Sequence, residues 1–182
     1  KGLEIPIVPV NMITGENQSE DYLAKNSLGK MPLLELDDGT CIAESAAICR
    51  YLEEMNPNPP LMGRNPLERA LVEMWHRRME LEFLIPMITI FLHTGEMWKD
   101  RVTQIPQVAE TGILNVKERM EWLDRELDGK EFITGEDYTV ADIAAQCAFV
   151  MGKAALGLRI AEDQLNLSNW FTRVSSRPTA RA

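Results

Sequence analysis

Hydrophobic and polar positions follow two different patterns along the chain, and the change falls near residue 56. Before that point, short apolar runs alternate with turn residues; after it, apolar residues recur every third or fourth position over long stretches. Between the two parts, "NPNPPLMG" at 56–63 contains too much proline to continue a helix. The pattern predicts two domains, 1–55 and 65–182, joined by a linker at 56–64.

The first part is typical of strands interrupted by a short helix. In "IPIVPV", two prolines remove ladder donors, which places this run at a sheet edge. Asp38 and Gly39 tolerate the positive φ of a tight hairpin and therefore join the two strands around them. The predicted elements are an edge strand at 5–10, a helix at 20–25 capped by Ser19, strands at 33–36 and 40–43, and a helix at 44–54.

The second part is typical of helices throughout. An apolar stripe that recurs every fourth residue predicts one long helix after Pro66, kinked at Pro86. The stripe consists of Leu71, Trp75, Met79, Phe83, Met87 and Phe91.

Three further helices are expected, at 113–127, at 138–152 and around 170–174. The middle one is apolar nearly all round, so we expect it to be central and buried. Thr139 and Asp142 have the spacing of a capping box at its start, which predicts a structural role for the Asp142 carboxylate.

Charge and cysteine content restrict the function. The chain has 182 residues and a formal net charge of −9, which disfavours binding to nucleic acid. No apolar run is long enough to suggest a membrane span. Three scattered cysteines without a C-x-x-C pair indicate reduced, buried thiols in a cytoplasmic protein, and with two histidines no metal site is expected.

Pro32, in "GKMPLLEL", stands where a strand would normally use its amide hydrogens. A trans proline at the first position of a strand is the commoner arrangement. The alternative is a cis Met31–Pro32 bond that lets Met31 offer its main-chain N–H and C=O to a peptide-like ligand. The local sequence leaves both arrangements open.

Glu44 and Ser45 stand where a helix begins. Free amides and the helix dipole favour an anion there, so the serine suits a carboxylate and the glutamate an ammonium group. Together they suit an α-amino acid head group. An N-capping serine beside a solvated acid is the plainer interpretation, and it also stays open.

Taken in order, these features resemble the cytosolic glutathione transferase family, and are most similar to its bacterial, theta- or beta-like members. The resemblance rests on "KNSLGKMPLLELDDGTCIAESAAICRYLEE", "EDYTVADIAAQC" and "NWFTRVSSRP" and covers the whole chain. It implies an α/β thioredoxin-like domain, incomplete because its first strand and helix are missing, followed by an all-α helical bundle. It also implies a cytoplasmic homodimer.

The resemblance implies glutathione as co-substrate and assigns five residues to it. Met31 would pair with the cysteinyl part through its main chain, with Pro32 cis behind it. Glu44 and Ser45 would hold the γ-glutamyl end, and Lys30, which is equally well explained as a solvated lysine, would lie near the glycyl carboxylate. The residue that activates the thiol, a Tyr, Ser or Cys in this family, would precede Lys1, so we expect that the chain is truncated.

The electrophile pocket would be walled by the middle of the long helix, with Met79, Glu82, Met87 and Phe91 as candidates. Arg77 and Arg78, on the expected dimer face, and Trp98 are candidates that are equally well explained as solvated or packed side chains. The function implied is conjugation of the glutathione thiolate to a hydrophobic electrophile. The alternatives are a glutathione-dependent reductase or isomerase, or a non-catalytic module for binding or dimerisation.

Overall fold

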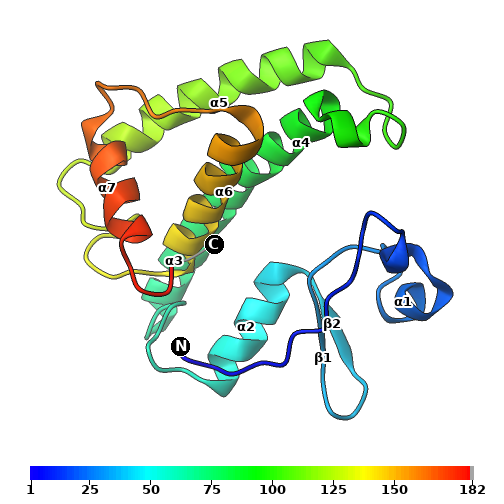
Figure 1. The fold of residues 1–182 in the computed structure, drawn as a ribbon. Coiled ribbons are helices and arrows are strands. Elements are labelled where there is room, and N and C mark those ends of the chain that lie inside the picture. Colours follow the sequence, from blue (N-terminus) through cyan, green and yellow to red (C-terminus); the bar gives the residue numbers. More distant parts are fainter. Residues whose placement is uncertain (181–182) are drawn as a thin grey trace. The chain divides into compact units, whose positions relative to one another are not determined.

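The computed structural model describes residues 1–180. The chain divides into two compact units, and the division falls between Leu61 and Met62, inside the stretch expected as a linker. Figure 1 shows a small unit with the only sheet of the described residues and a larger unit of helices.

The first unit is built on two antiparallel strands, β1 (Leu33–Glu35) and β2 (Cys41–Ala43), in which Leu33 lies opposite Ala43. The turn between them closes through a hydrogen bond from the Gly39 amide to the Leu36 carbonyl (2.9 Å). Only Gly39 takes a positive φ there, so the turn is longer than the two-residue hairpin that the Asp-Gly pair predicts. The unit's helices are η1 (Glu16–Gln18), α1 (Glu20–Lys25) and α2 (Ser45–Met55).

Residues 5–10 form no strand, which corrects the prediction of an edge strand. Ile7 and Val8 are 89% and 81% exposed, so this run buries almost no side-chain surface in the first unit. Pro6 and Pro9 have no amide hydrogen to donate. Residues typical of a strand form one only when a neighbouring strand supplies hydrogen-bond partners, and 5–10 has none among the described residues.

The predicted long helix is continuous, but its hydrogen-bond register changes in the middle. α3 (Pro66–Met79) runs into a π-helical turn, η2 (Glu80–Leu84), and then into α4 (Ile85–Thr94). Because Pro86 cannot donate to a carbonyl one turn earlier, the wider turn before it relieves the conflict. The irregularity predicted at the proline therefore takes the form of a π turn just ahead of it.

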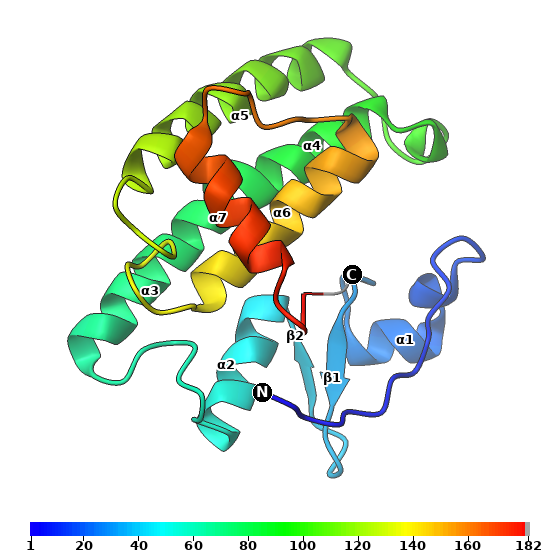
Figure 2. The same cartoon turned by 60° about the vertical axis from the view of Figure 1, so that its left-hand side comes forward.

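The remaining helices complete a bundle in which α4 lies along α5 and α6 lies along α3 (Figures 1 and 2). Three of them match the predicted helices, with longer bounds. These three are α5 (Pro106–Glu126), α6 (Val140–Leu156) and α7 (Leu165–Ser175), and the short η3 (Glu96–Trp98) was not predicted.

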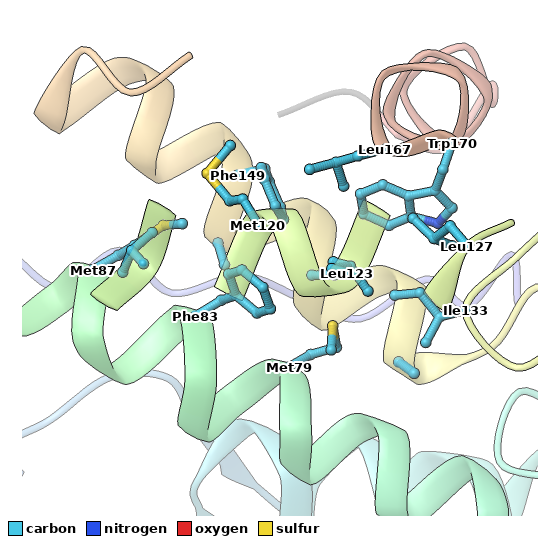
Figure 3. Packing of buried hydrophobic residues seen from close by; sticks show 14 of the residues in the cluster. Met79, Phe83, Met87, Met120, Leu123, Leu127, Ile133, Phe149, Leu167 and Trp170 are labelled. Atoms are coloured by element: carbon cyan, nitrogen blue, oxygen red, sulfur yellow. The ribbon is translucent and has the colours of Figure 1, made fainter. Parts of the chain in front are cut away.

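The core of the helical unit is formed where the apolar stripe meets α5, α6 and α7. Figure 3 shows Met79, Phe83 and Met87 pointing from the long helix into this core. They are fully buried, whereas Leu71, near one end of the stripe, is 45% exposed. A strict four-residue repeat drifts by about 40° per step around a helix, so the ends of the stripe turn away from the core.

Asp142 connects three segments of this core from a fully buried position. Its Oδ1 accepts from the Ile133 amide (2.9 Å) and from Trp170 Nε1 (2.8 Å), and its Oδ2 accepts from the Thr139 amide (2.9 Å). The Thr139 hydroxyl also lies 3.3 Å from Oδ2. The predicted capping box is present, and the carboxylate additionally ties α7 to the start of α6.

Candidate functional site

The register of the small sheet places the two candidate motifs at the same end of the hairpin. Leu33 and Ala43 form the last ladder pair at the end away from the turn. Met31 precedes that pair by two residues and Ser45 follows it by two, so both lie just beyond the open end of the ladder. A ligand at this end can therefore meet both motifs.

The Met31–Pro32 peptide bond is cis. The cis bond that the family resemblance implies is thus confirmed, and the trans bond that local sequence statistics favour is wrong. Within the described residues the Met31 main chain makes no hydrogen bond, and the residue is 37% exposed. Its N–H and C=O are available to an external partner with an extended backbone.

Side chains from the preceding helix and turn hold the segment before Met31 by its carbonyl groups. The Lys30 carbonyl accepts from Asn26 Nδ2 (2.7 Å) and from the Tyr22 hydroxyl (2.8 Å). The Gly29 carbonyl accepts from Asn17 Nδ2 (2.7 Å), and the Gly29 amide donates to the Asn26 carbonyl (2.8 Å). These contacts fix the direction in which the Met31 main chain emerges.

Sequence reasoning missed these positioning residues. Asn26 is buried and follows α1 directly, and an asparagine at a helix end three residues before a glycine is a turn signal that could have identified it. Gly29 has a φ of 61°, and a Cβ there would lie 2.7 Å from the Asn17 carbonyl. Only glycine fits this close approach.

The second motif combines a strained residue with free helix amides. Glu44 has a φ of 67°, the only positive value among the described residues other than glycine, and it stands directly before α2. Backbone strain of this kind is concentrated at ligand sites. The first hydrogen bond of α2 runs from the Ile48 amide to the Glu44 carbonyl (3.0 Å), so the amides of 45–47 remain available to an acceptor.

The charged and polar side chains of the site have no partners in the part of the chain described. Lys30, Glu44 and Ser45 are exposed, and none of their side chains makes a hydrogen bond or an ion pair there. A carboxylate next to a hydroxyl and free amides offers an acceptor for an ammonium group and donors for a carboxylate. The arrangement can therefore hold a zwitterionic amino-acid head group.

The four residues expected to wall an apolar pocket are in different environments. Met79 and Met87 are 0% exposed inside the helical core, so they have no surface for a ligand and we do not retain them as pocket residues. Glu82 pairs with Arg119 Nε of α5 (2.8 Å). Phe91 is half-buried and makes an edge contact with Trp98, with ring centroids 6.2 Å apart.

The remaining candidates have internal contacts that account for them. Arg77 pairs with Glu80, and the Arg78 guanidinium lies 4.8 Å from the ring centre of Trp75. His93, at the end of α4, was not a candidate in the sequence; its Nδ1 accepts from the Ile105 amide (3.1 Å), which connects the end of α4 to the start of α5. None of these contacts requires a ligand.

The described residues contain no group of three His, Cys, Asp or Glu side chains placed to hold a metal ion. The three cysteines, Cys41, Cys49 and Cys147, form no disulfide, and Cys49 and Cys147 are exposed, which corrects the prediction that the thiols are buried. Among the described helices, none combines the length and apolar character needed to cross a membrane.

Comparison with known proteins identifies relatives along nearly the whole chain. The model "Glutathione S-transferase, N-terminal domain" matches residues 1–54, and "Glutathione S-transferase, C-terminal domain" matches residues 83–178. Glutathione S-transferase 2 of Saccharomyces cerevisiae is 31% identical over 180 residues, which cover 97% of this chain and 76% of the relative.

Other relatives carry different names. Elongation factor 1-gamma of Rattus norvegicus is 30% identical over 168 residues, or 91% of this chain but only 36% of the relative. Maleylacetoacetate isomerase of Pseudomonas aeruginosa is 44% identical over 72 residues, which are 38% of this chain and 34% of the relative.

Solved structures agree with the sequence matches. A glutathione S-transferase domain-containing protein of Marinobacter aquaeolei superposes with a TM-score of 0.90 at 35% identity, covering 96% of this chain and 85% of the other. A glutathione S-transferase of class Gtt2 from Vibrio parahaemolyticus superposes with a TM-score of 0.86 at 37% identity, and the match covers 100% of this chain and 86% of the other. The predicted fold class, a thioredoxin-like domain followed by a helical domain, is confirmed.

Proposed function

The chain belongs to the glutathione S-transferase family, and on that premise we propose that it binds glutathione and conjugates its thiolate to a hydrophobic electrophile. The observation that carries the proposal is the hairpin register, which brings the unpaired Met31 main chain and the Glu44-Ser45 helix start to one end of the sheet. The Met31 main chain can pair with the backbone of a short peptide, and the Glu44-Ser45 helix start can hold an amino-acid head group. A γ-linked peptide such as glutathione offers both.

In this proposal each part of glutathione has its own contact. The Met31 main chain pairs with the cysteinyl residue, and Pro32 shapes the turn behind it. Ser45 and the free amides of α2 bind the γ-glutamyl carboxylate, Glu44 binds the ammonium group, and Lys30 binds the glycyl carboxylate. The charges of Glu44 and Lys30 are opposite to those of the groups they would meet, and the neutral Ser45 hydroxyl can donate a hydrogen bond to a carboxylate.

The chain's part in the chemistry is binding and orientation of the thiol. Holding both ends of the peptide fixes the sulfur between them, which converts a bimolecular encounter into a positioned attack. The thiolate attacks the electrophilic carbon, the leaving group departs with its bonding electrons, and the thiol proton passes to solvent. Phe91 and Glu82 remain the proposed contacts for the electrophile.

Calorimetric titration with glutathione, comparing wild type with Ser45→Ala, tests the binding site. Losing a hydrogen bond to a charged carboxylate costs about 1.5–3 kcal/mol, so we expect binding to weaken roughly 10- to 100-fold. Ser27→Ala, a matched change at another exposed serine of the same unit, should leave the affinity within about twofold. Equal affinity for all three proteins would refute the assignment of Ser45.

Turnover separates conjugation from its alternatives. With glutathione and 1-chloro-2,4-dinitrobenzene, conjugation releases chloride and forms a product that absorbs near the visible range. A protein that binds glutathione and conjugates none of a panel of electrophiles, but that turns over a cis-enoyl diketo acid, would be better described as an isomerase. The name of the Pseudomonas relative suggests that activity for that protein. Binding of neither glutathione nor its conjugates would favour a non-catalytic module.

We also propose a cytoplasmic homodimer formed through the long helix. Six large apolar side chains along α3, η2 and α4 are between 37% and 68% exposed. They are Leu67, Leu71, Met74, Leu81, Ile85 and Ile88. An exposed apolar row of this length on one helix is characteristic of a protein interface.

A further inference from the structure

The connection between α4 and α5, residues 95–105, lies at one end of the helical unit (Figure 1) and is held to α4 by two side chains. Gln104 Nε2 donates to two main-chain carbonyls at and just after the end of α4, at 3.0 and 2.9 Å. His93 Nδ1, in the last turn of α4, accepts from the Ile105 amide (3.1 Å). The connection therefore closes back onto the helix that precedes it.

Only the histidine contact depends on pH. An imidazole nitrogen accepts a hydrogen bond only while it carries no proton, whereas the Gln104 amide donates at any pH. Once His93 takes up a proton at Nδ1, its N–H faces the Ile105 N–H and the two donors repel. The closed connection stabilises the neutral imidazole and an open one does not, so proton uptake shifts the equilibrium toward the open form. Histidine is the side chain whose charge ordinarily changes between pH 5 and 8.

His93 is the only titratable side chain of α4 and makes no ion pair in the described part of the chain. Its place in the last turn favours a cation through the helix dipole. Nearby, Glu96 pairs with Lys99 (3.5 Å), and Glu82 of η2 pairs with Arg119 of α5 (2.8 Å). Carboxylates ordinarily titrate below pH 5, which leaves the imidazole to respond above it. The other charged groups on the segments that meet at this end are Asp100 and Arg101 of the connection, Glu110 of α5, Lys153 of α6 and Arg159 after it.

Trp98, inside the connection, gives the closed form a cost that opening removes. Its indole N–H is buried and has no hydrogen-bond acceptor among the described residues. A buried donor without a partner has lost the hydrogen bonds that water would supply. The indole ring contacts the edge of the Phe91 ring, with centroids 6.2 Å apart. Opening the connection would therefore hydrate the Trp98 N–H and uncover Phe91.

We propose that the α4–α5 connection is an acid-sensitive lid over Phe91, which opens when His93 is protonated. Its effect on activity rests on the proposed function, in which Phe91 is a contact for the electrophile. The lid includes none of the residues proposed to bind glutathione. Acid should therefore weaken binding of the electrophile's part of a conjugate and leave the peptide part unchanged.

Hydrogen exchange measured by mass spectrometry tests the opening at about pH 7.5 and about pH 5.5. The proteins are wild type, His93→Asn and His76→Asn, the last being the same change at the chain's other histidine. An asparagine oxygen can replace Nδ1 as an acceptor and does not titrate. Protection factors are compared because they divide out the intrinsic pH dependence of amide exchange, and thermal unfolding checks that each variant is folded at both pH values.

We expect protection of the connection to fall roughly 3- to 10-fold in acid in wild type and in His76→Asn, and less than about twofold in His93→Asn. Equal falls in wild type and His93→Asn, or no fall in either, would overturn the proposal.

Calorimetric titration with glutathione and with S-(2,4-dinitrophenyl)glutathione tests the effect on Phe91. The ratio of the two affinities isolates the dinitrophenyl group, and we expect it to fall roughly threefold in acid in wild type and to stay constant in His93→Asn. A ratio that does not change in wild type would overturn the role given to Phe91. If neither ligand binds, the proposed function fails, and the exchange data still decide whether the connection opens.

Discussion

Replacing Asp142 tests whether one buried carboxylate holds the helical unit together. Its two oxygens accept hydrogen bonds from the Ile133 amide, Trp170 Nε1 and the Thr139 amide, at 2.8–2.9 Å. Asp142→Ala leaves all three donors without an acceptor in a position that is 0% exposed. Asp142→Asn keeps the shape but replaces one acceptor oxygen with an NH₂ group.

The size of the loss follows from the number of donors left unpaired. A buried unpaired donor costs about 1–3 kcal/mol, and removing the carboxylate regains part of its own desolvation cost. For Asp142→Ala we therefore expect about 3–5 kcal/mol less unfolding free energy. Asn can still accept from Ile133 and Trp170 if its NH₂ faces Thr139, which leaves one donor unpaired and predicts a loss of about 1–3 kcal/mol.

Urea unfolding, followed by tryptophan fluorescence and far-ultraviolet circular dichroism, measures both losses. Asp137→Asn is the matched control, because Asp137 makes an exposed ion pair with Arg64 (2.9 Å). Such surface pairs contribute about 0–1 kcal/mol. A folded Asp142→Asn should bind glutathione as wild type does. If Asp142→Ala lowers the unfolding free energy by less than about 1 kcal/mol, or if both variants lower it equally, the number of unpaired donors does not set the loss.

Four further predictions follow from particular contacts. Burial raises the pKa of the Asp142 carboxyl, and its hydrogen bonds oppose that shift without cancelling it; the native state therefore holds this proton more tightly than the unfolded chain. The stability difference between wild type and Asp142→Asn should thus shrink as pH rises from about 3.9 through the raised pKa, and a difference that grows would contradict this. Asn26→Ala removes a donor to the Lys30 carbonyl (2.7 Å) and should weaken glutathione binding about 3- to 10-fold by calorimetry, whereas Asn115→Ala, on exposed α5 surface, should not. Gly29→Ala brings a Cβ to 2.7 Å from the Asn17 carbonyl and should lower both the melting temperature and glutathione affinity; an unchanged affinity would mean that this loop does not position the ligand. Leu81→Glu, at a side chain 49% exposed, should convert a dimer to a monomer in light scattering, and a dimer that persists would move the interface elsewhere.

Much of the fold could be predicted because its signals are local. Ser19 accepts from the Tyr22 amide (3.2 Å), as its place before an acidic helix start indicates. Thr139 and Asp142 form the capping box that their spacing predicts. In each case the donor and acceptor are within a few residues of each other, so the chain's own geometry brings them together.

The candidate site was predictable only in part. Met31, Pro32, Glu44 and Ser45 were identified by their order along the chain, and the hairpin register then placed them at one end of the sheet. The Asn26 and Asn17 side chains that hold this loop gave no periodic signal, because their partners are main-chain carbonyls whose direction depends on the turn.

The amino-acid sequence by itself determined which segments form the helices and the hairpin, and it predicted the caps at Ser19 and Thr139, although several helix bounds and the length of the turn differ from the prediction. Only the tertiary structure decided which members of a repeating pattern are buried. Met79 and Met87 were equal to Phe91 as pocket candidates in sequence, yet they are 0% exposed while Phe91 is half-buried. The run at 5–10 has strand composition but forms no strand. The physical reason is common to both: burial and strand pairing are properties of two surfaces that meet, and a single segment specifies only one of them.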